Sequence, residues 1–200
     1  QAAIGGTPTY SRPQCVGPIA VKDIDPCHAD TANFRAAVDR YVPVDAFMNA
    51  ASPGVIALFQ PDAHYGDHEE YLYALANAMQ AEYEAIVDAG FVLQLDSPDL
   101  GLGRHMMFKG EPDTEYERLA HLHVEALNHA VRNIDADRMR LHICWGNYEG
   151  PHTYDVPLAT VFDVCMKARP QALLFESANP RHEHEWEDLA EATIPDDKVL

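Results

Sequence analysis

The sequence predicts an α/β fold of the (β/α)8 barrel class, incomplete because about five strand candidates are too few to close a barrel. Three observations predict this fold. Strand-like and helix-like segments alternate along the chain, which is typical of a parallel sheet. Polar side chains stand at the ends of three successive strands, where barrel enzymes carry their active sites. No glycine-rich phosphate-binding turn follows any strand, so a doubly wound nucleotide-binding sheet is disfavoured.

Each element follows from the period of its apolar residues. Strands are predicted at 44–50, 91–96, 138–145 and 172–176, with a weaker candidate at 15–21; helices are predicted at 30–40, 67–89, 114–131 and 158–168. The helix at 67–89 is the clearest, because Tyr71, Leu75 and Met79 recur at helical spacing and Gly90 follows as a stop. Pro18 interrupts the weak first strand. We expect one domain, a catalytic barrel spanning 1–200 and incomplete at both ends.

Charge and cysteine content exclude several classes of function. The 200 residues contain 14 Lys and Arg against 32 Asp and Glu, a formal net charge of −18. Such a field repels phosphate backbones and anionic lipid, so we expect no nucleic-acid and no membrane partner. No apolar run approaches the ~20 residues that span a bilayer. The four cysteines form no Cys-x-x-Cys pair, which favours free thiols in a cytoplasmic protein.

The main candidate site is a metal centre at the strand ends. His142 and Cys144 occupy alternate positions of the strand at 138–145, so they point to one face, roughly 7 Å apart. Asp96 closes the preceding strand and Glu176 the following one. Imidazole, thiolate and carboxylate are all zinc ligands, and three protein ligands with one open position are typical of catalytic zinc. The alternative is that His142 and Cys144 form a packed core pair.

Two further acidic segments have simpler interpretations. Asp96 either holds an amino group or acts as a base, or it caps a turn, and for Asp99 we expect the turn. The segment His182-Glu183-His184-Glu185-Trp186 does not match the His-Glu-x-x-His zinc helix. We expect it to form a solvated loop or a first helical turn.

A longer motif carries a family resemblance. The segment Leu-His-Ile-Cys-Trp-Gly-Asn-Tyr-Glu-Gly-Pro-His at 141–152 resembles the zinc-strand motif of cobalamin-independent methionine synthases, in the shorter single-barrel branch called methionine synthase II-like. Segments 52–54, 93–100 and 175–186 resemble the same branch in the same order. The resemblance is clear over residues 44 to 200 and loose before them.

The resemblance implies a zinc-dependent thiol methyltransferase. The family's zinc ligands map onto His142, Cys144 and Glu176, and its strand-end acid, which contacts the amino group of homocysteine, maps onto Asp96. Ser52, in the first matched segment, is a further expected substrate contact. Zn2+ would bind a homocysteine-like thiol as its thiolate, which then attacks the N5-methyl group of a methyltetrahydrofolate-like donor.

Some features depart from the family pattern, and alternatives stay open. The family's fourth ligand is a cysteine downstream of the glutamate, and none of Cys15, Cys27 and Cys165 lies there. A complete barrel needs ~250 residues, so we expect an internal fragment whose open edges pair with a missing segment or, as a homo-oligomer, with another copy. The alternatives are an epoxyalkane:coenzyme M transferase, which uses the same zinc–thiolate chemistry, a non-catalytic zinc-binding barrel, and a porphyrinogen decarboxylase-type barrel, which we rank last.

Overall fold

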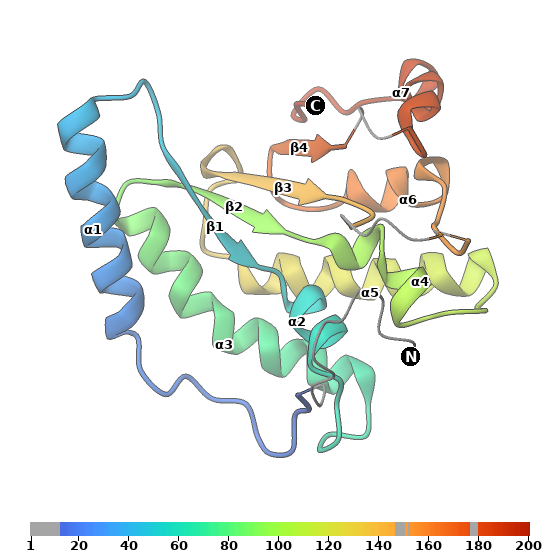
Figure 1. The fold of residues 1–200 in the computed structure, drawn as a ribbon, viewed down its shortest axis with the longest axis horizontal. Helices are drawn as coiled ribbons and strands as arrows, with labels where there is room; N and C mark the ends of the chain where they lie inside the picture. Colours follow the sequence, from blue (N-terminus) through green and yellow to red (C-terminus); the bar gives the residue numbers. More distant parts are fainter. Residues whose placement is uncertain (1–12, 147–150, 152, 177–179) are drawn as a thin grey trace.

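A four-stranded parallel sheet forms the centre of the molecule (Figure 1). The computed structural model describes residues 13–146, 151, 153–176 and 180–200. The strands are β1 (Phe47–Ala51), β2 (Val92–Asp96), β3 (Met139–Ile143) and β4 (Ala172–Phe175), hydrogen-bonded in the order β1-β2-β3-β4. Portions of the two longest predicted motifs, 147–150, 152 and 177–179, lie outside the described residues, as do residues 1–12.

Helices α2 to α6 connect the strands, whereas α1 precedes β1 and α7 follows β4. The helices are α1 (Asp25–Tyr41), α2 (Pro53–Phe59), α3 (His68–Asp88), α4 (Gly103–Met106), α5 (Asp113–Ala130), α6 (Leu158–Cys165) and α7 (Trp186–Glu191), with single 3-10 turns η1 (Pro98–Leu100), η2 (Ala136–Arg138) and η3 (Glu183–Glu185). Helix α3 packs against α5, and α5 packs against α6. Because neighbouring strands are consecutive in the chain and such crossovers share one hand, the connecting helices lie on the same face. We call the opposite face of the sheet the inner face.

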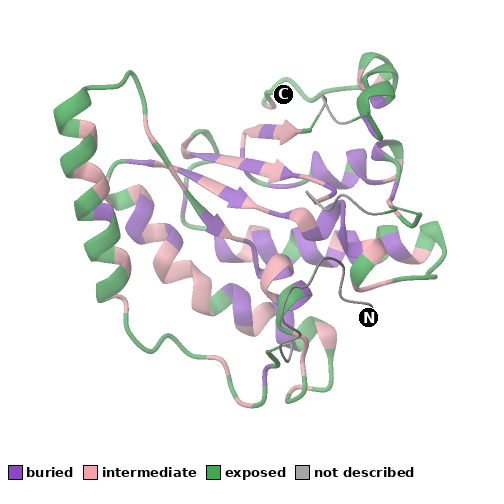
Figure 2. Ribbon diagram, viewed as in Figure 1, coloured by how far each residue is buried: buried purple, intermediate pink, exposed green. Residues whose placement is uncertain are grey.

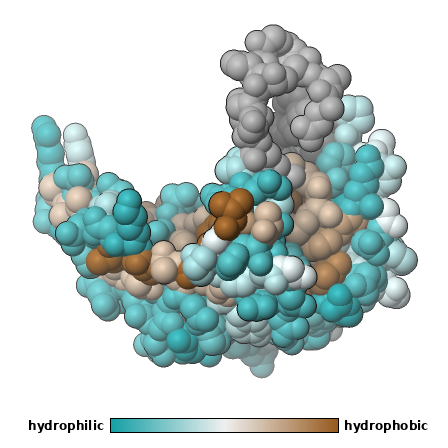
Figure 3. Space-filling model, turned by 90° about the horizontal axis from the view of Figure 1, so that it is seen from below, coloured by the Kyte–Doolittle hydropathy of each residue, from teal (hydrophilic) through white to brown (hydrophobic). Residues whose placement is uncertain are grey.

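Burial alternates along the strands, as the sequence predicts. In β2, Leu93 and Leu95 are buried, whereas Gln94 and Asp96 are half-buried, and β3 repeats this pattern. Figure 2 shows the same division: β2 and β3 carry buried and half-buried residues in turn, whereas β1 also carries exposed residues. The apolar core therefore lies between the sheet and its helices. Figure 3 shows a largely hydrophilic outer surface, with apolar residues gathered along the hollow above it.

The strand register brings the carboxyl ends of β1, β2 and β3 level. Asp96 pairs with Ala51 on one side and with His142 on the other. Beyond β4, Val199 forms an isolated parallel bridge with Ala172, on the side of β4 away from β3. The α/β class with a parallel sheet is confirmed. The four strands of the described residues form an open sheet, so a closed (β/α)8 barrel is not present in this part of the chain.

The predicted strand at 15–21 is wrong. Only Cys15 pairs there, in an isolated bridge with Asp62, and the rest has no regular structure. Pro18 lacks the backbone N–H that a ladder needs, which explains why the pairing does not extend. The predicted helix at 30–40 is longer than expected, because it begins at Asp25 with a proline in its first turn. Among the described residues, no helix combines the length and apolarity needed to cross a membrane.

Candidate metal centre

Asp96 and His142 meet at the carboxyl edge of the inner face. Asp96 is the last residue of β2, His142 lies opposite it on β3, and His142 Nδ1 is 3.1 Å from Asp96 Oδ1. A carboxylate oxygen only accepts hydrogen bonds, so the imidazole donates from Nδ1 and its lone pair is on Nε2. The side chains are 36% and 28% exposed, respectively. Nε2 is therefore the nitrogen that can bind a metal ion.

Asp96 is itself held by two amides from neighbouring positions. Gln94 Nε2 donates to Asp96 Oδ1 at 2.8 Å, and Asn49 Nδ2 donates to Oδ2 at 3.0 Å. Arg140 Nε donates in turn to Gln94 Oε1 at 2.8 Å. We refer to Asn49, Gln94, Asp96, Arg140 and His142 as the inner-face network. It joins three strands, and sequence reasoning found only two of its five members.

Cys144 and Glu176 lie at the ends of neighbouring strands. Cys144 follows β3 and is half-buried, and Glu176 follows β4 and is exposed. Burial is the main cause that raises the pKa of the Cys144 thiol; the negative charges of Glu176 and Asp96 raise it further, and a backbone hydrogen bond from Gly146 opposes them. The predicted ligands thus share one edge of the sheet. As they stand, no three His, Cys, Asp or Glu side chains of the described residues converge closely enough to hold a metal ion.

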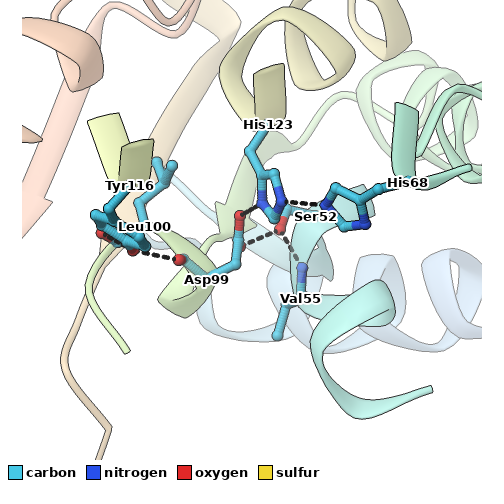
Figure 4. Close-up of polar contacts among 7 residues, drawn as sticks. All are labelled: Ser52, Val55, His68, Asp99, Leu100, Tyr116 and His123. Atoms are coloured by element: carbon cyan, nitrogen blue, oxygen red, sulfur yellow. Dashed lines mark hydrogen bonds and ion pairs between the residues drawn. The ribbon is translucent and has the colours of Figure 1, made fainter. Parts of the chain in front are cut away.

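Ser52 lies beside this edge with its hydroxyl directed into the protein (Figure 4). The hydroxyl accepts a hydrogen bond from Val55 N at 3.0 Å, which caps α2, and donates to Asp99 Oδ1 at 2.8 Å. The predicted contact between Ser52 and a substrate stays a prediction. Asp99 lies in the turn η1, as predicted, but its side chain does not have the expected capping role, because the carboxylate is buried and His123 Nδ1 lies 2.8 Å from Oδ2.

The buried contacts around Asp99 continue to the molecular surface. His123 Nε2 lies 2.9 Å from His68 Nε2. Since His123 Nδ1 donates to Asp99, a neutral His123 accepts at Nε2, and His68 is then the donor. Burial, followed by the neighbouring His123, lowers the pKa of His68 to about 4. We refer to Ser52, Asp99, His123 and His68 as the buried cluster.

The turn that contains Asp99 packs against the backbone of the candidate metal centre. The Tyr116 hydroxyl lies 2.9 Å from the carbonyl oxygens of both Asp99 and Leu100 and can donate to either. A Cβ atom on Gly101 would lie only 2.5 Å from the Cys144 carbonyl oxygen. The turn after Asp99 therefore packs directly on the backbone of Cys144, and only glycine allows this approach.

The segment at 182–186 is less exposed than predicted. His182 is buried and stacked on Trp145, with ring centroids 4.4 Å apart. Its Nδ1 lies 3.0 Å from Glu185 Oε2 and its Nε2 lies 3.1 Å from Asp155 Oδ2. The solvated-loop interpretation is therefore wrong for His182 and Glu185. The alternative of a first helical turn is confirmed, because Glu183–Glu185 form η3 and α7 begins at Trp186. Both residues belong to the turn that holds the chain after β4 against Trp145.

Comparisons with known proteins find relatives among methionine synthases. The methionine synthase of Saccharolobus solfataricus is 27% identical over 146 residues, and the methionine synthase of Saccharolobus islandicus strain L.S.2.15 is 28% identical over 102 residues. The chain is a distant homologue of methionine synthases. The first match covers 72% of this chain and 39% of the relative; the second covers 50% and 26%. The chain thus spans well under half of the curated relatives that it matches. No protein-family model matches the chain.

A solved structure shows the same fold. The B12-independent methionine synthase from Shewanella sp. W3-18-1, solved in complex with selenomethionine, superposes with a TM-score of 0.52 at 16% sequence identity. The match covers 72% of this chain and 41% of that one. At this identity the likeness concerns the fold of the sheet and its helices. The methionine-synthase relationship expected from the sequence motifs is confirmed as distant homology.

Proposed function

We propose that this chain carries the zinc-binding part of the active site of a zinc-dependent thiol methyltransferase. His142, Cys144 and Glu176 would hold the zinc ion, a homocysteine-like thiol would be the acceptor, and a methyltetrahydrofolate-like compound would be the donor. The observation that carries the proposal is the pairing of His142 Nδ1 with Asp96. This pairing leaves His142 Nε2 available to bind a metal ion on the inner face of the sheet, the face to which Cys144 is also assigned. The homology to methionine synthases supports the same interpretation.

The chemistry of these donors fits zinc. Imidazole nitrogen, thiolate sulfur and carboxylate oxygen are the three donor types that zinc takes from proteins, and three of them leave one position for a substrate. A ligating histidine normally donates its other ring N–H to a carboxylate or carbonyl group, and His142 donates to Asp96. Cys144 and Glu176 follow the adjacent strands β3 and β4, so both lie at the same edge of the sheet.

The chain's own residues would bind and orient the acceptor. Bound zinc would supply stabilisation of the acceptor's thiolate at neutral pH. Asp96 Oδ2 accepts one hydrogen bond, from Asn49, and a carboxylate oxygen has room for a second donor such as an ammonium group. In the transfer, the acceptor sulfur forms a bond to the methyl carbon while the carbon–N5 bond breaks. N5 carries a proton before this bond breaks, so the nitrogen departs as a neutral amine.

Zinc content of the purified chain tests the proposal first. We expect about one zinc per chain in the wild type, and we expect the zinc to be lost in Cys144→Ser. Cys27→Ser is the matched control, because Cys27 is also a half-buried free thiol but lies on α1. Zinc-loaded protein is then assayed for methyl transfer from methyltetrahydrofolate to homocysteine.

The outcomes separate the two parts of the proposal. A wild type without zinc, or equal zinc in wild type and Cys144→Ser, would overturn the metal centre. Zinc that depends on Cys144, without methyl transfer, would overturn the methyltransferase and leave a non-catalytic zinc site. We expect the wild type to bind zinc and to transfer the methyl group. We expect Cys144→Ser to lose both properties and Cys27→Ser to keep both.

A further inference from the structure

We propose that Arg140, Gln94 and Asn49 are positioning residues that fix the metal-binding orientation of His142 through Asp96. The inference rests on the proposed zinc site and extends it to residues that do not touch the metal. None of the three lies at a strand end, and each acts through a side chain on the inner face. Three links connect Arg140 to His142.

The first link fixes the orientation of the Gln94 amide. A glutamine amide can be turned by 180° with little change in shape, which exchanges its oxygen and its nitrogen. Arg140 Nε can only donate, and it donates to Gln94 Oε1 at 2.8 Å. Gln94 Nε2 is thereby directed to Asp96, 2.8 Å from Oδ1. With the amide reversed, Oε1 would face the carboxylate and repel it.

Arg140 is itself fixed by an aromatic ring. Its guanidinium carbon lies 3.5 Å from the centroid of the Phe47 ring. Arginine stacks well on aromatic faces because its planar cation meets the negative face of the ring. Phe47 belongs to β1 and Arg140 to β3, so the side chain reaches across β2. The stacking holds the guanidinium over the sheet, where Gln94 can accept from it.

The second link fixes the plane of the Asp96 carboxylate. Gln94 donates to Oδ1 and Asn49 donates to Oδ2, so each carboxylate oxygen accepts a hydrogen bond from a residue other than His142. The register makes this possible, since Asn49, Gln94 and Arg140 are direct neighbours across β1, β2 and β3. Two bonds on different oxygens stop the carboxyl group from rotating about its last torsion.

The third link passes that orientation to His142. Oδ1 of Asp96 accepts from Gln94 and from His142 Nδ1, at 2.8 and 3.1 Å. A fixed acceptor sets both the tautomer and the ring orientation of a histidine, and these decide where Nε2 points. Residues three or four steps away from the metal thus control the placement of a ligand atom. Loss of a group bonded directly to a metal ligand typically lowers metal affinity about 10- to 100-fold, so we expect a smaller loss from these more distant residues.

Zinc affinity in matched glutamine variants tests the inference. Gln94→Leu removes the donor to Asp96, and Gln80→Leu is its control, because Gln80 makes the same kind of bond, to Glu84 Oε1 at 2.7 Å, on α3. Zinc ions alone are titrated in competition with a chromogenic chelator. We expect binding about 2- to 10-fold weaker in Gln94→Leu, less than the loss typical of a ligand's direct partner, and within about twofold of wild type in Gln80→Leu.

Two more variants and a spectrum separate positioning from simple stability. Arg140→Met leaves Gln94 in place and should weaken zinc binding in the same direction. Asn49→Ala alters an exposed side chain and keeps the test decisive if Gln94→Leu does not fold. With cobalt in place of zinc, the visible absorption bands should shift in Gln94→Leu and stay unchanged in Gln80→Leu.

The failure of this inference differs from the failure of the proposed function. The positioning role would be overturned, and the metal centre left intact, if zinc affinity stays within twofold of wild type in all three variants, Gln94→Leu, Arg140→Met and Asn49→Ala. A wild type that binds no zinc would overturn both. Weaker zinc binding in Gln94→Leu that is matched by Gln80→Leu would show a general loss of stability and would also overturn the positioning role.

Discussion

Two aspartate–histidine pairs, whose acids are three residues apart, differ in almost every physical respect. In the pair Asp99–His123 the contact is 2.8 Å and each side chain is 2% exposed. In the pair Asp96–His142 the contact is 3.1 Å and about a third of the imidazole is exposed. The second ring nitrogen of His123 meets His68, whereas the described residues supply no hydrogen-bond partner for the second nitrogen of His142. Two features therefore distinguish an aspartate–histidine pair that stabilises the fold from one that can bind a ligand: the burial of its side chains, and whether the other ring nitrogen of the histidine already has a hydrogen-bond partner.

Replacing each acid by its amide should separate the two pairs most strongly. Asp99→Asn replaces the buried carboxylate that accepts hydrogen bonds from Ser52 and His123 by a neutral amide, so we expect unfolding free energy to fall by about 1.5–3 kcal/mol. Asp96→Asn alters a half-exposed pair and should cost less than about 1 kcal/mol. Urea denaturation of both variants measures the difference. Equal losses would contradict the assignment of different roles to the two pairs.

Gly54→Ala should crowd the buried pair alone. A Cβ atom at this position would clash with the carboxylate of Asp99 and the imidazole of His123, and neither group can move away without losing a hydrogen bond. We expect a loss of about 1–3 kcal/mol in unfolding free energy. Gly17→Ala is the control, because nothing lies within 4 Å of the added atom. A tolerated Gly54→Ala would show that the buried cluster is loosely packed.

Tyr116→Phe should weaken the turn that joins the two pairs. The variant removes the hydroxyl shared by the carbonyl groups of Asp99 and Leu100, both buried, while it keeps the ring. We expect a loss of about 1–2 kcal/mol in urea denaturation. Tyr73→Phe, on the half-buried side of α3, should change stability by less than about 0.5 kcal/mol. A Tyr116→Phe variant as stable as the wild type would argue against this support.

The pH dependence of stability should reveal the state of His68, at the outer end of the buried cluster. The pKa of His68 falls from about 6.5 to about 4 on folding. Between these values the unfolded chain binds more protons than the folded one, so unfolding free energy should decrease as pH falls from about 6.5 to about 4. His68→Gln should flatten this part of the profile, whereas His28→Gln, on the exposed side of α1, should not. An unchanged slope in His68→Gln would contradict the buried, neutral state of His68.

The sequence was a good guide wherever the physical signal is local. Alternation with period two placed His142 and Cys144 on one face of β3, and the structure leaves both half-buried between buried neighbours. The same rule, applied to Gln94 and Arg140, would have found two more members of the inner-face network. Asn49 was beyond reach, because its contact with Asp96 depends on how β1 and β2 align.

Asp99 shows why the rest could not be predicted. An aspartate between a proline and a leucine after a strand fits a turn, and the residues that make it a buried partner come from elsewhere: Ser52 follows β1 and His123 belongs to α5. The predicted strand at 15–21 is wrong for a different reason: in the described residues the long-range pairing that a strand needs is missing beyond Cys15, whereas at Asp99 the long-range contacts were present but could not be foreseen. Its local pattern suited a strand, but the described residues pair only Cys15 with a neighbour.

X-ray absorption at the zinc edge of the loaded chain tests the central claim most directly. The account predicts one sulfur scatterer at about 2.3 Å together with nitrogen and oxygen scatterers at about 2.0–2.2 Å. The sulfur should vanish in Cys144→Ser and remain in Cys27→Ser. A zinc shell of nitrogen and oxygen alone in the wild type would contradict the account.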